Sequence, residues 1–200
     1  MYLLLYLHGF NSSPDSRKAQ LSADWFAKHA PHIEFVCPQL PPYGFAAIER
    51  LNTLVEGRDS RNVFLIGSSM GGFFATFLIE KYGFRGVLIN PAVRPAAGLD
   101  RFLGNHRNYH SGEEWVFTQA HIDEYRHLEC AAIEKKSNVL ILLQTDDEVL
   151  DYRLAVEHYR GCAMVVESGG GHAFSTYAGH LGTILEFLMS EDTPSQSGFL

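Results

Sequence analysis

The sequence has few of the features that define several large protein classes. Its three cysteines are odd in number and far apart, which argues for reduced thiols and against a disulfide framework or a zinc site. Its 16 lysines and arginines are scattered along a chain of net charge −7, so no basic stripe marks a nucleic-acid partner. No low-complexity stretch or internal repeat is present. These absences favour an ordinary globular protein without a nucleic-acid partner.

Long hydrophobic runs are also missing. The chain begins with an apolar run, MYLLLYLHGF, but this run is too short to span a membrane. No basic residue precedes it, as one would in a signal peptide. We therefore expect a buried strand at the N-terminus and a cytoplasmic protein.

Short apolar runs alternate with stretches of helical periodicity along most of the chain. This alternation is typical of a parallel sheet covered by helices on both faces. We expect a single α/β domain over residues 1–190 with a mostly parallel sheet of about six strands, and a flexible tail at 191–200. Strands are predicted at 2–7, 33–37, 63–66, 85–90, 138–143 and 162–166, and helices at 16–29, 45–55, 70–82, 122–136, 150–159 and 174–189.

Residues 92–121 lack a clear period. They contain Pro95, Gly98, Gly104 and Gly112, and also several aromatic residues. A loop of this length inside a compact domain is usually functional or unordered. Because the aromatic residues favour a folded segment, we expect a short cap or insertion here, called the cap segment below.

A sharp turn follows the apolar run that ends at Ile66. Residues 67–71, GSSMG, match the G-x-S-x-G nucleophile elbow, with Ser69 at the tip of a strand–turn–helix unit. Side chains at Gly67 or Gly71 would clash with the neighbouring strand or helix. The alternative is a βα turn of small residues that does no chemistry.

Two further residues follow strands in the order of an α/β-hydrolase triad, serine then acid then histidine. Asp147 follows the fifth predicted strand and His172 follows the sixth. A serine hydroxyl needs a base such as His172 to take its proton, and an acid to orient that base. Asp147 is our choice of acid because it precedes Val149 in a D-x-V pattern. Asp146 ranks second, and Glu148 and Asp151 lie nearby.

The negatively charged intermediate of such a reaction needs hydrogen-bond donors. The backbone N–H of Met70, after the nucleophile, and that of Phe10, in the loop after the first strand, are the expected oxyanion hole. This chemistry requires no cofactor and no metal. His106 and His110 have a metal-like spacing, but nearby Gly104 makes a helix there doubtful and no acidic cluster supports it.

Six motifs together resemble one known family, the YqiA-type esterases, which are small bacterial α/β-hydrolases. They are YLHGFNSSP at 6–14, PQLPPY at 38–43, GSSMGG at 67–72, NPAVRP at 90–95, DEVLDY at 147–152 and GGGHAF at 169–174. The resemblance implies esterase activity on acyl esters, including acyl-CoA thioesters, with Ser69 as nucleophile, Asp147 as acid and His172 as base. One departure is Asp146, where the family generally has glycine.

Three functions are therefore compared. The first is a serine esterase that acts on acyl esters through an acyl-enzyme. The second is an acyl-CoA thioesterase, for which Arg94, Arg101 and Arg107 could contact phosphates. The third is a hydrolase-fold protein that binds a ligand without turnover, which a missing triad residue would favour.

Overall fold

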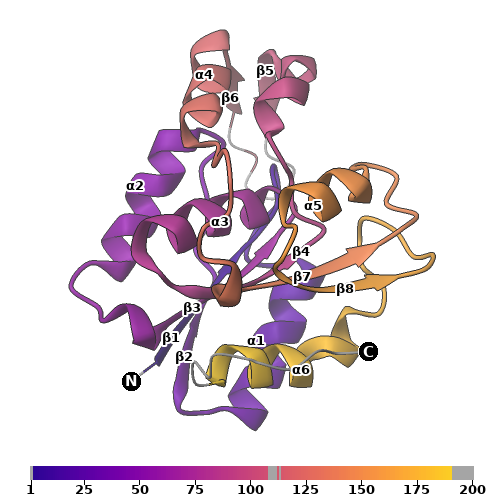
Figure 1. Ribbon diagram of the computed structural model, residues 1–200. Coiled ribbons are helices and arrows are strands. Elements are labelled where there is room, and N and C mark those ends of the chain that lie inside the picture. Colours follow the sequence, from indigo (N-terminus) through magenta and orange to yellow (C-terminus); the bar gives the residue numbers. More distant parts are fainter. Residues whose placement is uncertain (1, 108–111, 113, 191–200) are drawn as a thin grey trace.

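The computed structural model describes residues 2–107, 112 and 114–190, so the expected tail at 191–200 lies outside the described residues. Its centre is a sheet of six parallel strands (Figure 1). The strands lie in the order β2-β1-β3-β4-β7-β8, so the strand order reverses between β1 and β3. Their bounds are β1 Tyr2–Leu7, β2 Ile33–Val36, β3 Val63–Ser68, β4 Arg85–Ile89, β7 Val139–Gln144 and β8 Ala163–Glu167.

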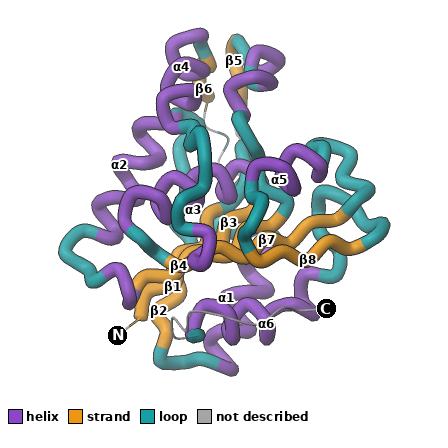
Figure 2. Tube along the Cα trace, viewed as in Figure 1, coloured by secondary structure: helices purple, strands orange, loops and turns teal. Residues whose placement is uncertain are grey.

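Helices cover both faces of this sheet (Figure 2). Helices α1 (Arg17–His29) and α6 (Tyr177–Met189) pack on one face, and α2 (Gly44–Val55), α3 (Met70–Tyr82) and α5 (Tyr152–His158) pack on the other. Strand β1 shows why both faces are covered, because its alternate side chains enter two separate hydrophobic clusters. Among the described residues, no helix has the length and apolar character needed to cross a bilayer.

The cap segment folds beyond this sandwich. Two 3₁₀ turns, Pro95–Gly98 and Asp100–Phe102, lead into an antiparallel hairpin of β5 (Gly104–Arg107) and β6 (Glu114–Phe117). Helix α4 (Gln119–Leu128) follows, and its buried Tyr125 joins the core on the α2 and α3 side. Figure 1 shows the hairpin and α4 standing together, away from the main sheet.

The predicted sheet and its covering helices are confirmed, but the final helix begins at Tyr177 instead of residue 174, and one predicted helix is wrong by several residues at both ends. In place of a helix at 122–136, α4 begins at Gln119 and ends at Leu128. The chain after it is held by tertiary contacts, since the Glu80 carboxylate accepts the backbone N–H groups of Glu134 and Lys135. These contacts satisfy backbone donors that a longer helix would have used internally.

Candidate active site

Ser69 occupies a strained turn between β3 and α3. Its backbone has φ 56° and ψ −120°, a conformation that non-glycine residues rarely adopt. The turn is held from outside, because the Ser69 N–H donates to the carbonyl of Ile89 at 3.0 Å and the Ser69 carbonyl accepts from Ala92 at 3.1 Å. The neighbouring strand β4 therefore fixes the serine beyond the end of the sheet.

The two outer glycines of this turn are sterically required. A Cβ at Gly71 would lie 1.8 Å from the Leu7 carbonyl oxygen of β1, and one at Gly67 would lie 2.4 Å from the carbonyl oxygen of Gly71. Neither contact is possible without moving backbone. Helix α3 thus packs directly against β1 and β3, which gives the serine its position.

The structure brings Ser69, His172 and Asp147 together from three separate strand ends. The Nε2 atom of His172 lies 3.0 Å from the Ser69 Oγ. The Nδ1 atom of His172 lies 2.8 Å and 3.0 Å from the two carboxylate oxygens of Asp147. The imidazole can therefore donate from Nδ1 to the acid and accept from the hydroxyl at Nε2.

The acid beside His172 is Asp147, as chosen from the sequence, and Asp146 points elsewhere. The Asp147 side chain is only 2% exposed, and its Oδ1 accepts the backbone N–H groups of Val149 and Leu150, each at 2.8 Å. Asp146 is exposed and its Oδ1 accepts from Thr145. Asp146 is not among the described residues with positive φ, so aspartate replaces glycine there without strain.

The loop that carries His172 is held by side chains at the ends of β4 and β7. Asn90, which is 3% exposed, donates from Nδ2 to the carbonyls of Gly171 (3.1 Å) and His172 (3.4 Å), and its Oδ1 accepts the Gln144 N–H. The side-chain oxygen of Gln144 accepts the Gly171 N–H at 2.9 Å. Gly170, with φ +74°, leaves the room that this amide needs.

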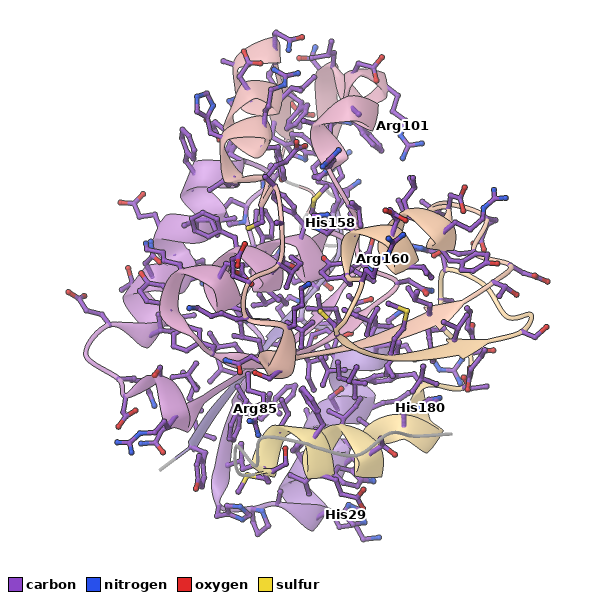
Figure 3. The ribbon with its side chains drawn as sticks, viewed as in Figure 1. His29, Arg85, Arg101, His158, Arg160 and His180 are labelled. Carbon is purple, nitrogen blue, oxygen red and sulfur yellow. The ribbon has the colours of Figure 1, made fainter. Side chains whose placement is uncertain are left out.

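The Gln144 amide is fixed in turn from the other side. Its Nε2 donates to Glu167 at 2.8 Å, and Glu167 also accepts from Thr176 and pairs with His180 of α6 (labelled in Figure 3). Hydrogen bonds from Thr176 and Gln144 lower the pKa of the Glu167 carboxyl to about 2. A polar network therefore connects α6 to the His172 loop.

Two charged side chains complete the support of this loop. The Glu148 carboxylate accepts the backbone N–H of His172 at 3.0 Å, and this bond lowers the pKa of Glu148. The Lys18 ammonium donates to the Ala173 carbonyl at 2.9 Å. Burial lowers the pKa of Lys18, while the Asp147 carboxylate acts in the opposite direction. Backbone groups on both sides of the imidazole thus have fixed partners.

These supporting residues were not predicted from the sequence, although two of them stand out as polar residues in an apolar context. Asn90 and Gln144 are each a polar residue at the end of an otherwise apolar strand, and each is buried. Buried polar side chains are generally hydrogen-bonded, so this position predicts a structural partner. The partner itself, the His172 loop, is far away in the chain and could not be inferred.

The loop after β1 lies against the serine. A Cβ at Gly9 would be 3.4 Å from the Ser69 Cβ. His8 is buried, with Nδ1 2.9 Å from the Gly9 carbonyl and Nε2 accepting the Leu40 N–H at 3.0 Å, so its ring ties two loops together. The N–H of Met70 is the first of helix α3, and within the described chain neither it nor the N–H of Phe10 donates to a carbonyl in another element.

A cavity of about 960 Å³ opens over Ser69 and His172. Its walls come from the loop after β1, helix α1, the cap segment, and residues 149–154 and 172–178. Among the described residues, four basic side chains and no acidic one line it: these are Arg17, Lys18, Arg94 and Arg101. Figure 3 labels Arg101 at the outer end of the cap segment. The cavity lining thus combines apolar surface with four basic side chains on a protein that is acidic overall.

Other candidate groups from the sequence are not brought together. His106 lies on β5 and stacks on Trp115, while His110 lies outside the described residues. Among the residues that the structure describes, no group of three His, Cys, Asp or Glu side chains is arranged to hold a metal ion. All three cysteines are free, and burial raises the pKa of Cys37 to about 12 and of Cys130 and Cys162 to about 11. These thiols are poor nucleophiles at neutral pH.

The parallel sheet, its helices and the serine turn define an α/β-hydrolase fold. The mouse α/β hydrolase domain-containing protein 10 has a similar structure, with a TM-score of 0.71, 13% identity, and coverage of 93% of this chain and 89% of the mouse chain. An esterase domain from Rhodothermus marinus aligns with a TM-score of 0.61 and 14% identity, over 92% of this chain and 84% of its own. At such identities the likeness concerns the fold.

Within that fold, the chain belongs to the family described as Uncharacterised protein family (UPF0227), whose model matches residues 3–189. A UPF0227 protein of Serratia proteamaculans is 23% identical over 190 residues, covering 92% of this chain and 98% of the relative. UPF0227 is the YqiA family, so the resemblance inferred from the six motifs is confirmed.

Proposed function

We propose that this protein is a serine esterase that hydrolyses acyl esters through an acyl-enzyme. The observation that carries the proposal is the continuous hydrogen-bonded path from the Asp147 carboxylate through His172 to the Ser69 hydroxyl. The esterase-type fold of its structural relatives supports the same reaction class. A protein with this arrangement has the nucleophile, base and orienting acid that ester hydrolysis needs.

The proposed reaction has two halves. His172 Nε2 takes the proton of Ser69 as Oγ attacks the ester carbonyl carbon, and the N–H groups of Phe10 and Met70 stabilise the oxyanion. His172 then gives the proton to the departing alcohol, and the acyl group stays on Ser69. Water, deprotonated by His172, attacks the acyl carbon, and the Ser69 oxygen leaves and recovers a proton. Asp147 keeps the imidazole oriented and stabilises its cationic form.

Thioester hydrolysis is a second candidate, because basic side chains line the cavity. Arg17, Lys18, Arg94 and Arg101 line the same cavity as Ser69, and none of these appears in an ion pair with an acidic residue of the described chain. Arginine and lysine are the usual partners of phosphate groups, which an acyl-CoA would bring. Arg107, the third arginine considered from the sequence, is not part of this cavity and interacts with the Gly112 carbonyl.

Hydrolysis of p-nitrophenyl esters from acetate to palmitate tests the proposal, with Ser69→Ala measured beside the wild type. We expect an optimum at one chain length and loss of turnover in Ser69→Ala, with an unchanged circular dichroism spectrum. Turnover of palmitoyl-CoA, measured beside that of the palmitate ester, compares a thioester with an ester of the same acyl chain. Full turnover by Ser69→Ala would contradict the proposal, and ligand binding without any turnover would favour the non-catalytic alternative.

A further inference from the structure

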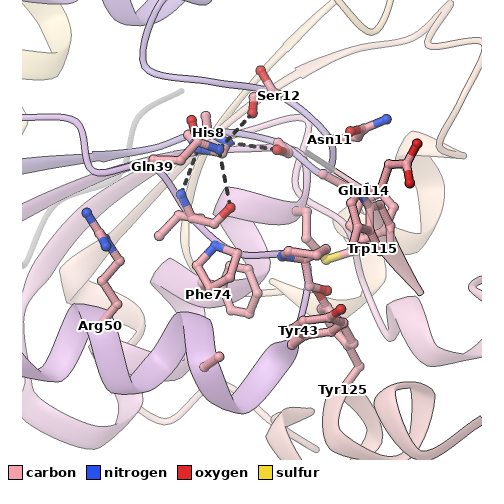
Figure 4. Close-up of a pocket in the computed structure, with 17 residues that line it drawn as sticks. His8, Asn11, Ser12, Gln39, Tyr43, Arg50, Phe74, Glu114, Trp115 and Tyr125 are labelled. Carbon is pink, nitrogen blue, oxygen red and sulfur yellow. Dashed lines mark hydrogen bonds between the residues drawn. The ribbon is translucent and has the colours of Figure 1, made fainter. Parts of the chain in front are cut away.

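A second cavity lies next to the catalytic one. Its volume is about 410 Å³, which is within the range of small-molecule pockets. It is lined by the loop after β1, residues 39–43, helices α2 and α3, and the three residues Glu114, Trp115 and Tyr125 (Figure 4). The size suits one ring or a short chain.

The lining of this second cavity is rich in aromatic rings. Figure 4 shows Tyr43, Phe74, Trp115 and Tyr125 on one side of the space, facing His8 and Gln39 on the other. Phe10 adds a fifth ring, and Arg50 and Glu114 add one charged side chain of each sign. Several of these rings meet edge to face, with Tyr43 and Trp115 centroids 6.3 Å apart at 88°. Rings arranged in this way offer both faces and edges to an aromatic guest, which gains more from such contacts than an aliphatic guest of equal size.

The loop walls of the cavity are held in place before any ligand binds. The Leu40 N–H donates to His8 Nε2, and the Gln39 Nε2 donates to the Ser12 carbonyl at 3.2 Å. The Tyr125 hydroxyl donates to the Pro42 carbonyl at 2.9 Å. Because these walls are already ordered, ligand binding costs little additional free energy for ordering them.

The second cavity and the catalytic cavity meet at the residues that flank Ser69. Gly9, Phe10 and Met70 line both of them. The Phe10 ring lies at the junction and packs on Phe102 (5.0 Å between centroids) and Trp115 (5.7 Å) of the cap segment. The two cavities are therefore adjacent beside Ser69, as the placement of one substrate in both of them requires.

We propose that the second cavity is a subsite for a planar aromatic ring of the substrate. The preferred substrates are then esters with an aromatic ring on one side and an apolar group in the larger cavity on the other. This inference rests on the proposed esterase function, but the binding of a ring to the cavity does not require turnover. Ala46 on α2 lines only the smaller cavity and Ala97 only the larger one, so they offer matched sites for blocking each space.

The kinetic test compares ethyl phenylacetate with ethyl cyclohexylacetate, which differ in the planarity of the ring, and uses ethyl acetate as a reference. The wild type should prefer the planar substrate by about tenfold in kcat/KM, a difference of roughly 1.4 kcal/mol. Ala46→Phe should lower kcat/KM for ethyl phenylacetate to the value for ethyl cyclohexylacetate, whereas Ala97→Phe should keep the preference. Equal preference in Ala46→Phe and the wild type would overturn the subsite. Benzyl acetate against cyclohexylmethyl acetate repeats the comparison with the ring in the alcohol.

A binding test separates failure of the subsite from failure of the esterase proposal. The chain has two tryptophans, so Trp25→Phe leaves Trp115 as the sole tryptophan reporter in the cavity wall. Benzyl alcohol should change its fluorescence saturably, cyclohexylmethanol should do so at least about fivefold more weakly, and Ala46→Phe should abolish the response. A saturable response here without ester turnover keeps the ring site and rejects the esterase. Turnover of ethyl acetate with no Trp115 response rejects the ring site alone.

Discussion

The carboxyl edge of the parallel sheet and the cap segment are held together by different forces. At the sheet edge, the groups around Ser69 are fixed by directional hydrogen bonds, such as the three made by the Asn90 side chain. In the cap segment, Trp115 and Phe117 hold the hairpin against Phe10 by ring packing. Hydrogen bonds specify position within tenths of an ångström, whereas ring contacts tolerate rearrangement. The proposed chemistry therefore lies in the region fixed by directional hydrogen bonds, and substrate choice is expected to depend on the cavities that the packed rings line.

The largest expected effect comes from the acid at the sheet edge. Asp147→Asn should lower kcat by about 10⁴-fold, because an amide cannot stabilise the imidazolium and can favour the wrong tautomer. Asp146→Asn is the matched control, since Asp146 is exposed and bonded to Thr145. We expect its kcat within about threefold of wild type. Steady-state kinetics on one ester measure kcat for both variants. Equal losses of kcat in the two variants would contradict the assignment of Asp147 as the acid.

Next is a comparison of two glycines. Gly71→Ala should destabilise the fold by more than about 3 kcal/mol, because its Cβ would meet the Leu7 carbonyl oxygen of β1 at 1.8 Å. Gly98→Ala in the cap segment has no heavy atom within 4 Å of the new Cβ and should change stability by less than about 1 kcal/mol. Urea unfolding measures both. A mild Gly71→Ala would show that α3 can move away from β1.

A smaller effect is expected from the support of the His172 loop. Asn90 has φ 40°, so Asn90→Gly removes its side-chain hydrogen bonds without adding backbone strain. We expect kcat to fall about 10- to 100-fold with KM within about threefold, because misplacement of the base affects the transition state more than binding. Asn105→Gly on exposed β5 is the control and should leave kcat unchanged. A KM effect alone would mean that Asn90 shapes the substrate cavity instead.

The smallest effect concerns pH and stability. The folded-state pKa of Glu167, about 2, is below the ordinary value of 4.5, so its contribution to stability is present above pH 4.5 and is lost as the pH falls towards 2. The difference in unfolding free energy between wild type and Glu167→Gln should shrink by about 1–2 kcal/mol between pH 7 and pH 3.

A control for this pH effect lies on helix α4. The exposed pair of Arg126 and Asp123 on α4 should contribute less than about 0.5 kcal/mol, so Asp123→Asn should follow the wild type at each pH. Urea unfolding at several pH values measures both variants. If the wild type and Glu167→Gln lose unfolding free energy equally as the pH falls, the result would contradict a stabilising hydrogen-bonded network around Glu167.

The two regions also differ in how well the sequence predicts them. Sheet strands are continuous apolar runs, and Ser69, Asp147 and His172 follow three of them directly, so their meeting at one edge follows from parallel topology. After α4 ends at Leu128, the Glu129 carboxylate accepts the Ala96 N–H and the Glu80 carboxylate accepts the Glu134 N–H, and no local pattern encodes these contacts. The sequences of β5 and β6 show no strong alternation of apolar and polar residues. Their hairpin is stabilised by packing on Phe10, which lies far away in the chain. Local periodicity predicts elements, whereas long-range contacts decide their limits.

The most direct test of the account is labelling with a fluorophosphonate, which reacts with activated serine hydroxyls, followed by peptide mass spectrometry. The account predicts one adduct per chain, located on Ser69 and absent in Ser69→Ala, with labelling at least about 100-fold slower in His172→Ala because the base is missing. No adduct in the wild type, or an adduct of equal rate in His172→Ala, would contradict an activated nucleophile at Ser69.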